Sequence, residues 1–116
     1  MGYTTKFRGC VAVEPALTLE HYQALKSLYD PESESPFRTK DCPTGYCQWQ
    51  PNRQGTALEW DGGEKFYDSV EWMSAIADQL TQRGYTLNGE IEAQGEEVGD
   101  HWKLVVRRGV VSEIPL

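Results

Sequence analysis

The chain lacks any apolar stretch near the roughly 20 residues that a membrane-spanning helix needs. Its first ten residues, MGYTTKFRGC, also lack the apolar run of a secretory signal peptide. These absences predict a cytoplasmic protein that does not associate with a membrane. At 116 residues, with 39% hydrophobic and 25% charged residues, the chain is expected to fold as a single domain over residues 1–116.

Metal-ligating residues are scarce, with three cysteines and two histidines. Cys42 and Cys47 form a C-x4-C pair in a loop, whereas zinc sites use tighter pairs and a second pair of ligands. Cys10, His21 and His101 are each isolated in the sequence. We therefore expect no metal and free thiols in a reducing compartment, with a site at Cys42 and Cys47 as the open alternative.

Sequence motifs for catalysis and cofactor binding are also missing. No G-x-G-x-x-G or G-K-[ST] pattern surrounds Gly62 and Gly63, and no G-x-S-x-G or H-E-x-x-H motif occurs. A Cys47–His101 nucleophile and base would need an orienting third group, and none is evident. The sequence thus predicts no cofactor, no catalytic residues and, more generally, a protein that is not an enzyme.

Basic residues are outnumbered by acidic ones, 11 to 18, which gives a net charge of −7. The excess is concentrated in residues 59–100, where eleven acidic and two basic residues give −9; the remainder has seven acidic and nine basic residues, or +2. Such a negative region repels nucleic acid and attracts basic surfaces. Direct nucleic-acid binding is therefore disfavoured, although one expected sheet face carries a basic strip of Lys6, Arg8, Lys103 and Arg107.

Hydrophobic periodicity predicts the secondary structure. Alternation predicts strands over residues 3–13, 85–93, 102–107 and 110–114, and two shorter strands over 47–50 and 56–60. Apolar residues at helical spacing predict helices over 19–29 and from about 64 to 83, with Thr18 and Asp61 as candidate N-caps and Gly84 as the C-terminal stop. Across the hairpin of the last long strands, Glu90 and Glu92 are expected to face Lys103 and Arg107.

This order of elements predicts an α+β fold. We expect an antiparallel sheet of five to six strands with two helices packed on one face, in a ferredoxin-like arrangement with an added C-terminal hairpin. Residues 30–46 are rich in proline, serine and charge and form a long loop, longer than a compact domain usually carries without a use for it. The loop is the first candidate for a mobile or partner-binding segment.

Three strings, MGYTTKFRG, GTALEWDGGEKFYDSVEW and GYTLNGEIEAQGEE, resemble a family of short uncharacterised proteins of bacteriophages, prophages and bacteria. The resemblance covers most of the chain. It implies an accessory protein of a phage or mobile element that binds and inhibits host machinery, for example as an anti-CRISPR or other counter-defence protein. The family supplies no catalytic residues to transfer to this chain.

The acidic side of the second expected helix is the leading candidate for partner binding. Glu64, Asp68, Glu71 and Asp78 lie away from its apolar stripe and are expected to engage a basic surface of a host protein. Trp49, beside the long loop, and Trp72, beside the stripe, are the candidate aromatic anchors, with packing in the core or at its boundary as the more common role of such residues. Trp102 lies on an inward strand face and is expected in the core.

Two alternatives remain open at this point. Trp60, Asp61 and Glu64 are close in sequence at a helix start and supply an aromatic ring and carboxylates for a small-molecule site, a metal site or an enzyme. Alternatively, the open face of the sheet pairs with a second copy to form a homodimer.

Overall fold

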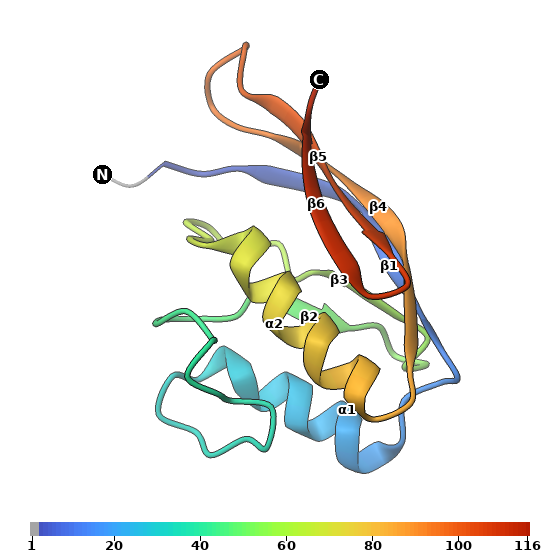
Figure 1. Ribbon diagram of the computed structural model, residues 1–116. Helices are drawn as coiled ribbons and strands as arrows, with labels where there is room; N and C mark the ends of the chain where they lie inside the picture. Colours follow the sequence, from blue (N-terminus) through green and yellow to red (C-terminus); the bar gives the residue numbers. More distant parts are fainter. Residues whose placement is uncertain (1–2) are drawn as a thin grey trace.

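The computed structural model describes residues 3–116. The chain forms strand β1 (Lys6–Glu14), helix α1 (Leu19–Lys26) with a 3-10 turn η1 (Ser27–Tyr29), and strands β2 (Trp49–Pro51) and β3 (Ala57–Trp60). Helix α2 (Ser69–Gln82) and strands β4 (Thr86–Gln94), β5 (His101–Arg107) and β6 (Val110–Pro115) complete it (Figure 1). No helix in this part of the chain is long and apolar enough to cross a membrane.

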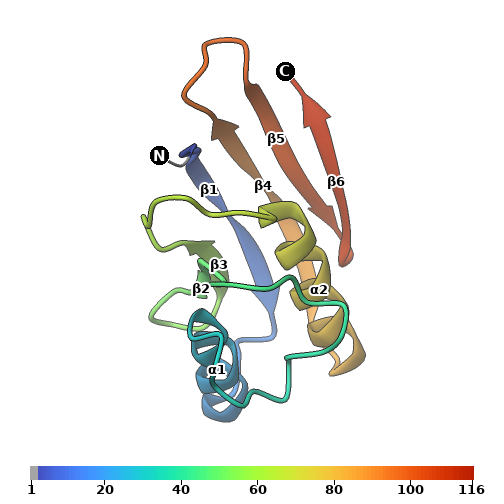
Figure 2. The same cartoon turned by 90° about the vertical axis from the view of Figure 1, so that its left-hand side faces the viewer.

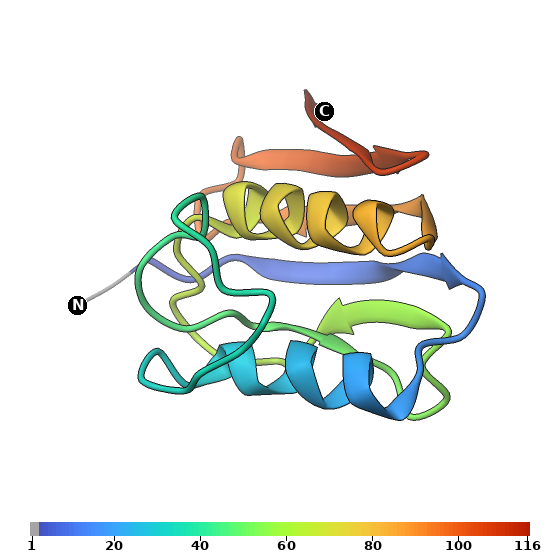
Figure 3. The same ribbon diagram turned by 60° about the horizontal axis from the view of Figure 1, so that its bottom comes forward.

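The strands form one six-stranded sheet in the order β2-β3-β1-β4-β5-β6, and every neighbouring pair is antiparallel. Because β1 and β2 are both antiparallel to β3, they run parallel to each other with β3 inserted between them, which is the split βαβ arrangement. Both helices lie on the same face of the sheet (Figure 3). The predicted α+β class is confirmed, including the ferredoxin-like strand order and the added β5–β6 hairpin.

The centre of the sheet is the pairing of β1 with β4, which are in register over nine residues. Phe7, Val11 and Val13 point to the helix side and are buried, as their alternation predicted. The backbones approach closely where glycines replace side chains: a Cβ on Gly89 would lie 2.5 Å from the carbonyl oxygen of Cys10. Glycine is therefore required at this position by the neighbouring strand.

Helix α1 begins as predicted. The Thr18 hydroxyl accepts a hydrogen bond from the His21 backbone N–H at 3.2 Å, the bond expected of an N-cap. Ala24 and Leu25 are buried beneath it. The helix tightens into η1 before the chain enters the long connection to β2.

Helix α2 begins later than predicted, at Ser69. The expected N-cap Asp61 instead accepts a hydrogen bond from the Gly63 backbone N–H at 2.7 Å, which closes a local turn. The chain then remains irregular, with Lys65 and Asp68 in the left-handed region at φ 58° and 59°. This path carries the Phe66 ring into the core against Phe7, so burial of one aromatic side chain outweighs the helical propensity of the segment.

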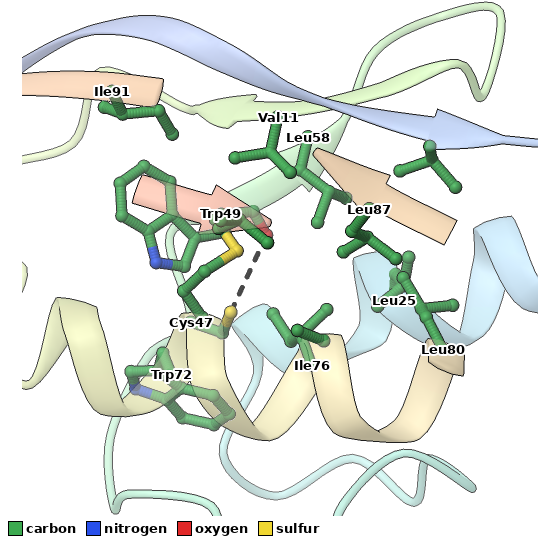
Figure 4. Close-up of a cluster of buried hydrophobic side chains, with 14 of the residues drawn as sticks. Val11, Leu25, Cys47, Trp49, Leu58, Trp72, Ile76, Leu80, Leu87 and Ile91 are labelled. Carbon is green, nitrogen blue, oxygen red and sulfur yellow. Dashed lines mark hydrogen bonds between the residues drawn. The ribbon is translucent and has the colours of Figure 1, made fainter. Parts of the chain in front are cut away.

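The core lies between the sheet and the helices, where ten of its side chains are labelled in Figure 4. Met73, Ile76 and Leu80 of α2 are fully buried, each worth about 1.5–3 kcal/mol of transfer free energy. The long loop joins this core as well: Phe37 is 1% exposed, and the guanidinium carbon of Arg83 lies 4.5 Å from the centre of its ring. The loop therefore packs against the helix layer.

Candidate functional site: an acidic surface along helix α2

Three carboxylates surround a groove beside α2. Glu71 and Asp78 lie on exposed positions of the helix two turns apart, and Asp41 faces them from the long loop. The groove has a volume of about 430 Å³, and its remaining lining is small and largely apolar: Ser74, Ala75, Gly109, Val110 and Val111. The groove thus combines three carboxylates with small and aliphatic side chains.

A second groove, of about 520 Å³, lies at the N-terminal end of α2. Glu64 and Asp68 line it together with Lys65 and the loop residues 44–46. Two tyrosines at its walls are unusually exposed for aromatic residues, Tyr46 at 56% and Tyr67 at 58%. Exposed tyrosines are enriched in protein interfaces because they bury a large area at low entropic cost.

We call these two grooves together the α2 acidic surface, defined by Asp41, Glu64, Asp68, Glu71, Asp78, Tyr46 and Tyr67. Within residues 3–116, every ion pair involves Glu90 or Glu92, so none of the carboxylates of the α2 acidic surface has a cationic partner. Asp78 accepts one neutral hydrogen bond, from the Gln82 amide. Their charge is therefore directed into solvent and available to a partner.

The carboxylates of β4 are in a different environment on the open face of the sheet. Glu92 bonds His101 Nε2 at 2.5 Å and Arg8 at 3.0 Å, while Glu90 bonds Lys103 at 2.9 Å and Arg107 at 3.4 Å. The hydrogen bond from His101, and then that from Arg8, hold the pKa of Glu92 below its usual range. The hydrogen bond and charge of Lys103 lower the pKa of Glu90 in the same way.

These pairs answer two expectations from the sequence. The cross-strand contact of Glu90 with Lys103 and Arg107 is confirmed. Glu92 lies opposite Lys103 in the strand register, as expected, but forms its ion pairs with His101 and Arg8. The expected basic strip is consequently neutralised at three of its four members. Lys6 is the exception.

The expectation that Trp49 and Trp72 are exposed anchors is wrong. Trp49 is 2% exposed and donates its indole N–H to the carbonyl oxygen of Ser69 at 2.8 Å. Trp72 is fully buried, and its indole Nε1 has no hydrogen-bond partner among the described residues. The buried side of helix α2 is wider than its apolar stripe, so Trp72 beside the stripe is part of the core. Trp102, which was expected in the core, is partly buried and packs against the core cluster.

The alternative site at Trp60, Asp61 and Glu64 does not assemble. The indole N–H of Trp60 donates to the Gln48 side chain, and Asp61 is engaged in its own turn. Glu64 lines the groove beside Tyr46 and Tyr67, whereas Trp60 lines a different cleft. The three side chains therefore share no pocket.

No group of three or more histidine, cysteine or carboxylate side chains within residues 3–116 is placed to hold a metal ion. Cys42 is partly exposed and Cys47 is buried, and both are free thiols. Burial raises the pKa of the Cys47 thiol to about 12, so it is neutral and unreactive at physiological pH.

The tyrosines and Asp41 are the members of the α2 acidic surface that the sequence did not single out. Asp41 and Tyr46 both lie in residues 30–46, which the sequence predicted to be a loop without indicating any individual residue in it.

Comparisons with protein-family models, with curated proteins and with solved structures give no match for this chain.

Proposed function

We propose that this protein is a non-enzymatic binding protein that captures a basic surface of another protein through the α2 acidic surface. The observation that carries the proposal is that five carboxylates without cationic partners line two grooves, one beside α2 and one at its N-terminal end, and that exposed tyrosines line the second. Negative charge of this kind steers a basic partner and favours it over other surfaces.

The groove beside α2 suits a lysine or arginine side chain in particular. The aliphatic stem of such a side chain lies over Ala75 and Val110, and its charged end reaches the carboxylates of Glu71, Asp78 and Asp41. The tyrosines of the neighbouring groove add apolar contact area and hydroxyl groups. The two grooves together fit several basic side chains on one partner.

The biological setting of the proposal rests on the family resemblance. It makes the protein an accessory factor of a phage or mobile element that acts in the cytoplasm of a bacterial host. The partner is then a host protein or complex whose basic surface normally holds DNA or RNA, such as a CRISPR or restriction component. Occupying that surface inhibits it by competition with the nucleic acid.

The test is capture from bacterial lysate with a tagged protein, comparing wild type with the triple variant Asp41→Lys, Glu71→Lys, Asp78→Lys. Asp68 is left unchanged because its left-handed backbone has a structural role. The matched control, Glu14→Lys, Glu32→Lys, Glu34→Lys, changes the net charge equally at exposed positions outside both grooves. Loss of a captured protein in the first variant alone supports the proposal; equal capture by both variants sinks it.

A further inference from the structure

Strand β1 has a free edge in the middle of the sheet. It pairs with β4 along its whole length, but β3 pairs with it only at Val11 and Ala12. Residues 6–10 therefore have no strand on their β3 side, as Figure 2 shows for the half of β1 nearer the N-terminus. Within the described residues, no backbone hydrogen bond outside the β4 ladder involves this stretch. The edge presents unpaired peptide groups, the template to which another strand adds.

A cleft of about 470 Å³ lies beside this edge. Phe7 and Trp60 form its apolar wall, with their rings edge to face at 5.5 Å between centres. The polar lining comes from the open face of the sheet: Lys6, Arg8, Glu92, Gln94 and His101. We call this set of residues the β1 cleft.

The lining of the β1 cleft carries one more cation than carboxylate, with Lys6 and Arg8 against Glu92, on a protein whose net charge is −7. No carboxylate within residues 3–116 forms an ion pair with Lys6, and the exposed guanidinium of Arg8 has Glu92 as its one ionic partner there. Glu92 also binds His101, so one carboxylate is shared between two cationic or polar partners. The cleft therefore retains a net attraction for negative groups.

We propose that the β1 cleft binds an extended segment of a partner protein in which apolar and acidic residues alternate. The segment adds as a strand along residues 6–10, where β3 has diverged. Successive side chains of a strand point to opposite faces of the sheet, so one set packs against Phe7 and Trp60 while the other meets Lys6 and Arg8. The first set is apolar and the second acidic.

This site is separate from the α2 acidic surface in position and in charge. Lys6 and Arg8 alternate with the buried Phe7 along β1 and therefore lie on the face of the sheet opposite the helices. The cleft selects negative side chains where the α2 acidic surface selects positive ones. The two proposals can therefore fail independently.

The probe is a fluorescent peptide of about seven residues alternating valine and glutamate, long enough to span the free edge at roughly 3.3 Å per residue. Binding is followed by fluorescence anisotropy. We expect this peptide to bind the wild-type protein and an analogue with uncharged glutamine in place of glutamate, which the α2 acidic surface would not attract, to bind at least about tenfold more weakly. N-methylation of alternate peptide bonds, which removes backbone donors, is expected to weaken binding by a similar factor. Equal binding of the three peptides, or none up to about 1 mM, would overturn the proposal.

Variants of the protein locate the site. Lys6→Glu with Arg8→Glu is expected to lose at least about tenfold in affinity for the glutamate peptide. The control pair Lys40→Glu and Arg53→Glu carries the same charge change at exposed positions outside the cleft and is expected to keep it. Equal loss in both pairs would refute a specific site. The peptide comparison on wild-type protein stands if the cleft variant does not fold.

Two further outcomes separate the proposal from its neighbours. A dimer in sedimentation that dissociates on Lys6→Glu with Arg8→Glu would overturn it, because the free edge would then belong to a second copy of this chain. The triple lysine variant of the α2 acidic surface is expected to bind the glutamate peptide at least as well as wild type; loss of binding there would place the peptide on the wrong face.

Discussion

The carboxylates of β4 and those of α2 belong to the same acidic stretch of sequence but differ in what surrounds them. Glu90 and Glu92 each have two partners across the open face of the sheet. Glu71 and Asp78, with Asp41, face a groove without a described cationic partner. Net charge counted along the sequence therefore overstates the negative potential on the open face of the sheet. It also hides the difference in potential between that face and the α2 acidic surface. What makes an acidic region available to a partner is the absence of cations on neighbouring strands or turns.

The largest effect that this contrast predicts concerns binding of a basic probe. A labelled peptide of about six lysines should lose on the order of 10- to 100-fold in affinity when Glu71→Lys is combined with Asp78→Lys, because attraction becomes repulsion at the groove. Glu90→Gln with Glu92→Gln should change it little, since these charges are already neutralised. Anisotropy at low and high salt measures both. A greater loss from the β4 pair would reverse our assignment of the two faces.

An intermediate effect concerns stability against pH. The pKa values of Glu90 and Glu92 are lowered in the folded state from an unfolded value of 4.5. The two glutamates therefore make their full contribution to the free energy of unfolding above pH 4.5, and this contribution disappears as the pH falls through their folded pKa values. The urea concentration at the unfolding midpoint of the wild-type protein should decrease as the pH is lowered below about 5. The double variant Glu90→Gln with Glu92→Gln should show a smaller decrease. Glu71→Gln, which removes a carboxylate without an ionic partner, serves as the comparison; an identical profile for the two variants would contradict the role of the pairs.

The smallest effect concerns a thiol probe on the open face. Cys10 is exposed on β1, whereas Cys47 is buried with its pKa raised to about 12. N-ethylmaleimide at neutral pH should modify Cys10 readily and Cys47 only after unfolding, as mass spectrometry of the digested protein would show. Capture of the lysine peptide should be unchanged by the Cys10 adduct, because the adduct lies on the face opposite α2. A change in capture would mean that the two faces are coupled.

The elements that sequence periodicity predicted well are those whose environment is set by their own residues. Phe7, Val11 and Val13 alternate because one face of β1 is buried, and Thr18 caps α1 through a bond three residues away. Both the alternation and the N-cap depend on residues that are close in sequence, so both can be recognised from the sequence alone. The antiparallel sheet with two helices followed from the order of such signals.

The failures arise where distant segments decide the outcome. Trp72 looks like a boundary residue within its helix, but α2 is covered over more of its circumference than one stripe of apolar residues implies. Aspartate is favoured both at helix N-caps and in local turns, so the residue type of Asp61 does not distinguish the two. Asp61 forms the turn, and the chain that follows it buries Phe66 in the core. The candidate carboxylates of α2 were foreseeable, but not the tyrosines or Asp41, since their placement depends on the path of a loop with no period of its own.

The pairing of the first long strand with the fourth also has a consequence for the route by which the chain folds. Lys6 is in register with Gln94, so the central pair of the sheet closes a loop that includes most of the sequence. Strands β4, β5 and β6 are joined by short connections and contact one another locally. Contacts of large sequence separation slow folding because the entropy of loop closure is lost before they form. On a ribosome, β1 must wait for β4 to be synthesised, so a nascent chain that stops before residue 86 lacks the partner that holds its N-terminal strand in place.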